Sequence, residues 1–510
     1  MPVKVTVHDL GRRSLGGATR CAIAGLCSGV DDGKVVEVLK TNFETTLERG
    51  PGLVQARDYF NHGGERLVFA GIDQNGATPG TTGTVTLSEG SGLASATSDD
   101  TEQPLFSREL ALRVKRVLGG RGRPGSTYAQ FSVDGGVTYS EAEILLAVTG
   151  GDGTTTPYKT RLYYEHLAAG GLPYVGTDGK GPYVEFTEDS GTPDDSFLVG
   201  DVWTWDSSAV EPTQEAVLDA AEALVDWRDA FGMQTAERQG GLIGIAHPLE
   251  ATFWDDLNSI AQERYESQTA QNFNAFIAVA PQANEATTQE AVDRVTSDVA
   301  AYRAALGTDK PWAHLTWLWG RIDDGFGNTT PRPLIGAILG RLAADGAHVE
   351  RSYAWRKAAR ALRMGIALDP PDLTLDQLEQ LAGNRVSALV HEPGLGFYPY
   401  CDYHAAQADS KLTNFRYLRS VNFAATVALL RSQTWKFAPG TDGRSKADQE
   451  NYINDELRRL VELGAFDECT FHLGDVVDPE AERLVFKGTI TVRPVKSRES
   501  YDYDLYLVLS

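Results

Sequence analysis

Alternating apolar and polar residues predict a pair of β-strands in the last part of the chain. Four apolar residues between 484 and 492 share one parity: Leu484, Phe486, Ile490 and Val492. Beyond Pro494 a second set shares one parity: Tyr501, Tyr503, Leu505, Leu507 and Leu509. A period of two residues is that of a half-buried strand.

The first ten residues repeat the pattern, with Val3, Val5 and Val7 separated by polar residues. An unpaired strand exposes backbone N–H and C=O groups that another chain can bond. The terminal segments therefore predict one of two arrangements. Either they pair within their own domain, or they are arms that pair with a neighbouring subunit and build a polymer. The pattern alone leaves both open.

Apolar runs alternate with amphipathic helices on both sides of residues 73–206. Buried-type strands are expected at residues 21–26, 67–72, 241–246, 274–280 and 313–319. Helices are expected at residues 53–60, 214–227, 251–264 and 289–306. Strands that alternate with helices favour a largely parallel sheet covered on both faces.

Residues 73–206 have a different composition, rich in Gly, Thr, Ser and Asp. Short alternating runs predict strands at residues 84–87, 128–133, 183–186 and 197–205, and residues 107–118 predict a helix. We expect a mostly β inserted domain here. Toward the C-terminus a long helix is expected at residues 414–437. A second is expected from about Lys446, with Ser445 as its N-cap and Gly464 at its end.

The chain of 510 residues carries a net charge of −23, which disfavours nucleic acid and anionic lipid as partners. It contains no run of ~18 apolar residues, so no membrane-spanning segment and no direct membrane binding are expected. Four scattered cysteines predict buried thiols, not a disulfide framework. One segment departs from the acidic balance: the basic run Arg113–Arg123 predicts a solvated loop or an ion-pairing edge.

Candidate chemistry is sparse. Residues 120–125 fit G-x-G-x-x-G, but a strand-like run follows them where a dinucleotide site needs a helix. An acid/base pair could be built from His247, His314, Asp323 and Asp324. Asp194, Asp195 and Asp201 could hold a cation, and Trp312, Trp317 and Trp319 could line a sugar site. Core packing and polar turns explain these residues as well. We therefore expect no catalytic, cofactor-binding or metal site and no cofactor.

Three segments, taken in order, resemble the sheath protein of contractile phage tails and related injection systems. In residues 56–72 a helix, Phe60-Asn61, Gly63-Gly64 and a strand follow one another, with His62 inserted. Residues 336–422 contain Gly336–Gly340, Trp355–Ala358, Leu373-Thr374, Leu378–Leu381, Asn384–Leu389, Pro393–Gly396 and Tyr417–Asn422. Residues 457–508 contain a helix ending at Leu463-Gly464-Ala465, a strand, Val492–Val495 and a closing strand. Trp355 lacks the usual following proline, and residues 73–206 match nothing in the pattern.

The resemblance implies an α+β / α/β multidomain fold with no active site. Residues 1–20 would be an arm and strand exchanged with a neighbour, and residues 401–510 an inner α+β domain, which both termini help to build. Residues 21–75 and 207–400 would form a central α/β domain with a mixed sheet, and residues 76–206 a β-rich outer domain. Strand exchange would use Val3, Val5, Val7, Tyr501, Tyr503, Leu505 and Leu507. Arg458 and Arg459, on the helix that the resemblance places at the tube surface, are candidate tube contacts.

Implied partners are further copies of the chain in hexameric rings stacked helically, the tail tube protein, and baseplate and tail terminator proteins. The implied location is the virion tail, assembled in a bacterial or archaeal host cytoplasm. Two other functions stay open from the sequence: an α/β hydrolase-type enzyme with a β accessory domain, and a β-augmented shell protein that does not contract. Open helical contacts give long tubes, whereas an enzyme gives a small closed oligomer.

Overall fold

The structure, a computed structural model, describes the following residues of the chain. They are 21–72, 78–167, 172–227, 242–266, 275–280, 285–306, 313–317, 319–321, 331–344, 367–369, 373–392, 396–401, 424, 427–428, 431, 443–462, 466–476 and 486–494. The terminal arm residues 1–20 and 495–510 lie outside this set.

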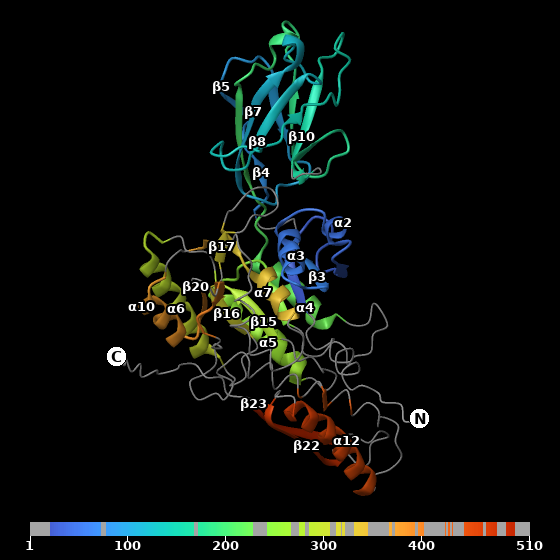
Figure 1. The fold of residues 1–510 in the computed structure, drawn as a ribbon, viewed down its shortest axis with the longest axis vertical. Helices are drawn as coiled ribbons and strands as arrows, with labels where there is room; N and C mark the ends of the chain where they lie inside the picture. The colour runs from blue at the N-terminus through green and yellow to red at the C-terminus, as the bar shows by residue number, and fades with distance from the viewer. Residues whose placement is uncertain are drawn as a thin grey trace, which may run out of the picture.

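An eight-stranded sheet forms the centre of the molecule, which we call the α/β body (Figure 1). Its strands, in spatial order, are β2 (Val35–Leu39), β3 (Arg66–Ile72), β1 (Cys21–Leu26), β14 (Leu242–Ile245), β15 (Ala275–Val279), β16 (Ala313–Trp317), β20 (Ser387–Glu392) and β21 (Gly396–Pro399). The six strands from β3 to β20 are parallel, and β2 and β21 run antiparallel at the two edges. The parallel core agrees with the alternation of strands and helices in the sequence.

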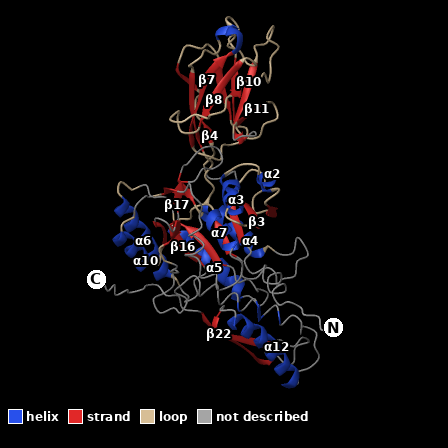
Figure 2. Cartoon of the chain, viewed as in Figure 1, coloured by secondary structure: helices blue, strands red, loops and turns tan. Residues whose placement is uncertain are grey.

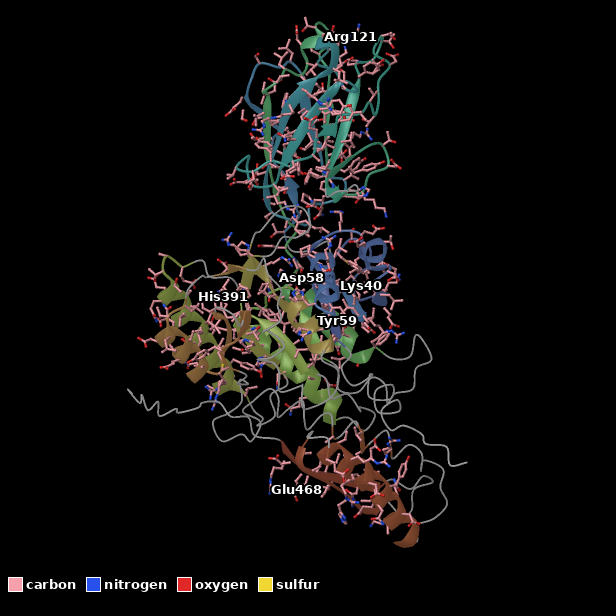
Figure 3. The ribbon with its side chains drawn as sticks, in the orientation of Figure 1. Lys40, Asp58, Tyr59, Arg121, His391 and Glu468 are labelled. Atoms are coloured by element: carbon pink, nitrogen blue, oxygen red, sulfur yellow. The ribbon has the colours of Figure 1, made fainter. Side chains whose placement is uncertain are left out.

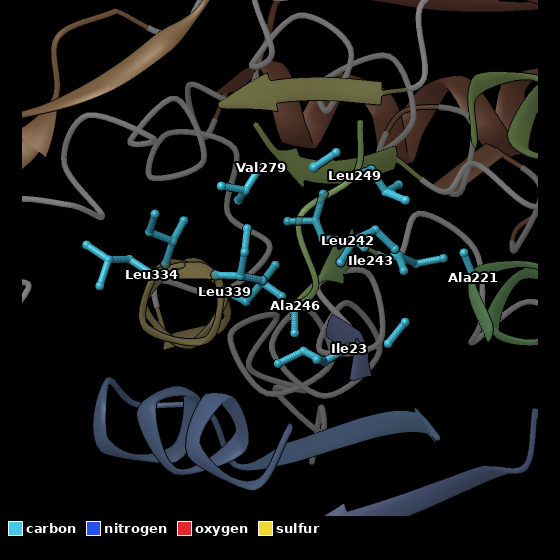
Figure 4. Close-up of a cluster of buried hydrophobic side chains, with 14 of the residues drawn as sticks. Ile23, Ala221, Leu242, Ile243, Ala246, Leu249, Val279, Leu334 and Leu339 are labelled. Atoms are coloured by element: carbon cyan, nitrogen blue, oxygen red, sulfur yellow. The ribbon is translucent and has the colours of Figure 1, made fainter. Parts of the chain in front are cut away.

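Helices pack on this sheet because one face of each is apolar. They are α2 (Phe43–Leu47), α3 (Pro51–Asn61), α4 (Gln214–Asp226), α5 (Trp254–Glu266), α6 (Thr288–Ala305), α7 (Ile335–Ala344) and α10 (Leu375–Gly383). Threonine caps begin three of them: Thr213 for α4, and Thr287 and Thr374 in capping boxes for α6 and α10. Figure 4 shows the buried aliphatic side chains that strands and helices share, among them Ile23, Leu242 and Leu339.

Helices α3 and α7 pack closely although nearly 280 residues separate them. A Cβ on Gly336 would lie 2.0 Å from Gln55 O, and one on Gly340 would lie 2.2 Å from Tyr59 O. The Gln55 side chain donates to Pro333 O and accepts from Gly336 N, both at 2.7 Å. The ring of Tyr59, in α3, lies against Gly64, which follows the helix. A Cβ on Gly64 would lie 2.1 Å from Tyr59 Cε1. Glycine at these positions is therefore a steric requirement.

Residues 78–208 form a second layered unit, the β sandwich, which lies at one end of the α/β body in Figure 2. One sheet contains β4 (Thr81–Thr82), β5 (Thr86–Glu89), β13 (Val202–Ser208), β7 (Arg108–Val117), β8 (Thr127–Ser132) and β9 (Ile144–Leu145). The other contains β11 (Pro173–Val175), β10 (Lys159–Leu167), β12 (Tyr183–Thr187) and β6 (Ser95–Asp99). Side chains from both sheets form one apolar cluster, with Trp205 against Tyr164 and Trp203 against Phe186.

The helix predicted at residues 107–118 is wrong, because this segment is strand β7. Leu110, Val114 and Val117 have helical spacing, but Leu110, Leu112 and Val114 also have strand spacing, and all three of the latter are buried in the sandwich. Pairing with β8 and β13 on either side decides between the two periods. The expected mixture of helices and sheets is confirmed in the described residues.

Smaller elements complete the described chain. A three-stranded sheet contains β18 (Pro331–Pro333), β17 (Trp319–Arg321) and β19 (Ala367–Leu368), and 3-10 turns occur at Leu118–Gly120, Pro193–Asp195 and Ala251–Phe253. Near the C-terminus lie helix α12 (Gly443–Glu462) and the antiparallel pair β22 (Phe466–Val476) and β23 (Phe486–Pro494). Because α12 begins at Gly443, the predicted N-cap Ser445 is wrong and lies inside the helix. All four cysteines are buried, and none forms a disulfide.

Candidate assembly site

Helix α12 and the β22–β23 hairpin form a small unit with its own apolar cluster, which we call the hairpin unit. Figure 1 shows it on the opposite side of the α/β body from the β sandwich. From α12 the cluster takes Ile453, Leu457 and Leu460, and from β22 it takes Cys469, Phe471 and Leu473. Ile490 and Val492 of β23 pack against it from the edge. The alternation seen in the sequence at residues 490–493 is therefore the alternation of burial in the strand.

The second face of the hairpin is polar. Glu468, Thr470 and His472 of β22 and Thr489, Thr491 and Arg493 of β23 are all exposed. An ion pair joins Arg493 Nη1 to Glu468 Oε2 at 3.2 Å across the strands, and Figure 3 shows Glu468 at the surface of this unit. One face of this two-stranded sheet packs on α12 and the other is exposed, so the hairpin is covered on one face only.

The outer edge of β22 is occupied by side chains of α12. Asn454 Nδ2 donates to Phe471 O at 2.8 Å, and Phe471 N donates to Asn454 Oδ1 at 2.7 Å. Leu473 N donates to Glu450 Oε2 at 2.9 Å. These side chains satisfy backbone groups that an edge strand normally leaves open. An additional strand would have to displace them to pair with β22.

The outer edge of β23 has no such cover among the described residues. Phe471 lies opposite Ile490, and since Asn454 bonds both backbone groups of Phe471, this is a pair without mutual hydrogen bonds. The N–H and C=O of Ile490 therefore point away from β22. Val492, two residues along and opposite Cys469, is oriented in the same way. Within the described part of the chain no residue bonds these groups, so there the outer edge of β23 is uncovered.

The strand-exchange residues predicted from the sequence lie outside the described residues. This applies to Val3, Val5 and Val7 and to Tyr501, Tyr503, Leu505 and Leu507. Their pairing stays a prediction. Sequence reasoning identified the alternation in β23 but missed Asn454 and Glu450, whose role depends on a contact 17 to 23 residues away along the chain.

Arg458 and Arg459 lie on the exposed side of α12. Arg458 Nη1 is 3.0 Å from Asp455 Oδ1, with both side chains about two-thirds exposed. Arg459 Nη1 is 3.6 Å from Glu456 Oε2. Exposed pairs of this kind contribute only ~0.2–1 kcal/mol and weaken in salt. Local pairing therefore leaves both guanidinium groups available to a stronger partner.

The residues considered for other chemistry are dispersed. His314 is fully buried in β16, and burial lowers the pKa of His247 to about 4. Trp317 and Trp319 belong to the body's core, while Trp312, Asp323 and Asp324 lie outside the described residues. Asp201 is buried and accepts the backbone N–H groups of Ser91 and Leu198. Within the described ranges, no group of three His, Cys, Asp or Glu side chains could hold a metal.

No described helix is both long and apolar enough to cross a membrane. No protein-family model matches the sequence, and no curated protein matches it.

Solved structures of contractile sheath proteins are similar to this chain over much of its length. A sheath tail protein from Desulfitobacterium hafniense is 10% identical, with a TM-score of 0.46, covering 94% of this chain and 97% of that one. The helical sheath of the anti-feeding prophage in its contracted state is 8% identical, with a TM-score of 0.49 and coverages of 96% and 93%. The contracted sheath complex of the extracellular injection system PVC is 15% identical, with a TM-score of 0.38 and coverages of 52% and 70%. At these identities and TM-scores the likeness carries no functional conclusion.

Proposed function

We propose that this chain is the subunit of a contractile tail sheath. Copies of it would polymerise as hexameric rings stacked helically around a rigid tail tube. Contraction of that polymer would drive the tube through the envelope of a target cell. The further partners would be the tube protein and the baseplate and tail terminator proteins, and the assembled location would be the tail of a particle built in the host cytoplasm.

The observation that carries the proposal is the outer edge of strand β23 in the hairpin unit. Among the described residues, strand β23 is paired on one side only, with one apolar face on α12 and one polar face. A strand with alternating apolar residues could bond the backbone groups of Ile490 and Val492 and extend the apolar face over α12. Residues 3–7 and 501–509 both have that alternation.

The reach of the chain is sufficient for exchange between subunits. Sixteen extended residues span ~50 Å, so an N-terminal arm of that length crosses to a neighbouring copy. Head-to-tail contacts of this type generate a ring where the rotation between copies closes and an open helix where it does not. Strand exchange of this kind keeps subunits connected while they move as rigid bodies between two packings.

Deletion of Met1–Ser14 tests the proposal. The truncated protein should fold as a monomer that cannot assemble, as judged by circular dichroism, analytical ultracentrifugation and negative-stain images of the purified material. The full-length chain should give long tubes under the same conditions. Tubes from the truncated protein would contradict strand exchange, and a small closed oligomer from the full-length chain would instead favour an enzyme.

Ile490→Pro tests the edge itself. Proline removes the N–H that points away from β22 and leaves the β22–β23 hydrogen bonds in place. Ile490→Thr is the matched control, since it loses similar packing and keeps the donor. We expect monomeric Ile490→Pro and polymerising Ile490→Thr, with similar circular dichroism. Equal assembly of the two variants would exclude β23 as the accepting edge.

A further inference from the structure

The β sandwich joins the α/β body through a buried, charged contact. Arg49 lies between α2 and α3 of the body and is 3% exposed, and Glu165 lies on β10 of the sandwich and is 1% exposed. Arg49 Nη1 is 2.7 Å from Glu165 Oε2. These residues are 116 positions apart, so their contact exists only when the two units are docked.

Both partners make additional hydrogen bonds. Arg49 Nη1 also donates to Gln103 O at 2.9 Å, and Nη2 donates to Glu102 Oε2 at 3.3 Å. Glu165 Oε1 accepts the N–H groups of Leu105 and Phe106, each at 2.9 Å. Nη1 and Nη2 of Arg49 and both carboxylate oxygens of Glu165 are therefore bonded, as a stabilising buried ion pair requires. Arg49 Nε is buried and has no hydrogen-bond partner among the described residues.

An apolar contact lies beside the ion pair. Leu105, 1% exposed, packs against Leu26 at the end of β1 and against Val210. A Cβ on Gly50 would lie 2.8 Å from Leu105 Cδ1, so the leucine fits against bare backbone. On the other side of Arg49, a Cβ on Gly181 would lie 3.0 Å from Arg49 Nε. A second ion pair between the two units joins the exposed Lys180 to the partly buried Glu48.

We propose that Arg49, Glu165 and the segment Glu102–Phe106 form an interdomain latch that fixes the β sandwich to the α/β body as one rigid arm. The sandwich would then follow every rotation of the body and keep a fixed orientation at its surface. This property concerns the single chain, goes beyond the proposed function and does not depend on polymerisation. It predicts that opening the latch exposes Leu105 and Phe106 without unfolding either unit.

Site-resolved proteolysis of the full-length chain tests the latch. Chymotrypsin cleaves after leucine and phenylalanine, and mass spectrometry follows the fragments that begin at Phe106 or Ser107. Removing one partner of a buried pair leaves the other charge uncompensated, so Glu165→Gln and Arg49→Met should each raise the rate of these cleavages roughly 100-fold. Small-angle scattering should show a broader distribution of interdomain distances in both variants.

Two controls complete the experiment. Asp194→Asn breaks the exposed pair with Arg123 (Nε to Oδ1, 2.6 Å) away from the latch and should leave the cleavage rate unchanged. The near-ultraviolet signal of Trp203 and Trp205 reports whether the sandwich core stays intact. If a single variant unfolds, the double variant Arg49→Met/Glu165→Met removes both charges together. Its cleavage rate should stay near that of the wild type, or should rise by less than the product of the two single-variant increases. The latch would be overturned if both single variants were cleaved at the wild-type rate. It would also be overturned if the increase in the double variant equalled the product of the two single increases.

Discussion

At the scale of single residues, glycine determines how closely distant segments approach. Gly336 and Gly340 face the backbone of α3 at distances where no Cβ fits, and Gly64 lies beneath the ring of Tyr59. Tyr59 also donates its hydroxyl to Arg66 O at 2.7 Å, which joins the end of α3 to the start of β3. Gly64, Gly336 and Gly340, which belong to the segments of the sequence resemblance, thus have a steric reason independent of any function.

Gly336→Ala should destabilise the chain by ~1–3 kcal/mol, because the new methyl group overlaps the backbone carbonyl of Gln55 and forces α7 away from α3. Gly383→Ala is the matched control. This glycine ends α10 with nothing within 4 Å of the new Cβ, and alanine favours the helix by up to ~1 kcal/mol. Urea unfolding of both variants would check the difference. Equal midpoints would contradict the close packing of α3 and α7.

A partly buried histidine, His247, should make stability depend on pH. Burial lowers the pKa of His247 to about 4, whereas the unfolded side chain keeps its ordinary value of ~6.5. The unfolded state therefore binds a proton first as pH falls, and the stabilisation present above pH ~6.5 is lost progressively down to pH ~4. His247→Gln should lose less stability than wild type between pH 7 and pH 4.5, measured by urea unfolding at each pH. Parallel curves for the two proteins would exclude this histidine.

At the scale of elements, strands with the same alternating pattern differ in whether their edges are paired or covered by other parts of the fold. Strand β7 has partners on both sides within the sandwich, and β22 has an outer edge covered by Asn454 and Glu450. Strand β23 has a partner on one side only among the described residues. An edge strand of this length with uncovered backbone is an aggregation hazard unless a partner strand occupies it. Under the proposed function, the hairpin unit is the element that would take part in assembly.

Helix α12 should also contact the inner tube through Arg458 and Arg459. Their local pairs with Asp455 and Glu456 are exposed and weak, so an acidic partner surface could displace them. The double variant Arg458→Glu/Arg459→Glu should still form tubes of sheath alone but should fail to assemble around the tail tube in the extended state. Electron microscopy of the reconstituted particles is the measurement. Normal extended particles would contradict the contact.

A matched control for that double variant is Asp448→Lys with Asn451→Lys. Both residues are exposed on the same helix and lie away from the arginine pair. This control changes the charge of α12 by a similar amount in the opposite direction and should preserve assembly around the tube. If both double variants fail equally, any change on the exposed face of α12 prevents assembly, and the result does not support a specific arginine contact.

At the scale of the whole molecule, the β sandwich and the hairpin unit extend from different sides of the α/β body (Figures 1 and 2). The sandwich has its own core and is inserted between β3 and α4, so both of its connections leave the same body. Large units of this kind tolerate removal when no strand of the body's sheet depends on them. None of the eight strands of that sheet comes from residues 78–208.

Excision of Asp73–Asp206 with a short linker should therefore leave a chain that folds and polymerises. The excision removes Leu105 and so exposes Leu26. It also removes the hydrogen-bonding partners of Arg49. Leu26→Ser and Arg49→Ser in the excised chain should improve its solubility without changing assembly. Ultracentrifugation and images of tubes are the checks. An excised chain that folds but stays monomeric would assign the sandwich a role in assembly.

The sequence by itself determined the local elements with strong periodicity. It predicted β1 at residues 21–26 and placed β3, β14, β15, α4 and α6 within one or two residues of their ends, because burial on a sheet imposes periods of 2 and 3.6. It also predicted the parity of Ile490 and Val492 on β23, which is half of the candidate assembly site. The basic run at residues 113–123 is indeed partly an ion-pairing edge, with Arg116 on Glu143 and Arg123 on Asp194.

Only the tertiary structure decided which of these elements meet. Residues 107–118 satisfied both periods, and pairing with β8 and β13 made them a strand. Which edge of the hairpin is covered depends on Asn454 and Glu450, and the latch depends on Arg49 meeting Glu165. A lone polar side chain has no periodicity, and its partner lies across a contact formed only after folding. For that reason composition and spacing specify the strands of this protein, while three-dimensional packing decides which edge of the hairpin α12 covers and brings Arg49 to Glu165.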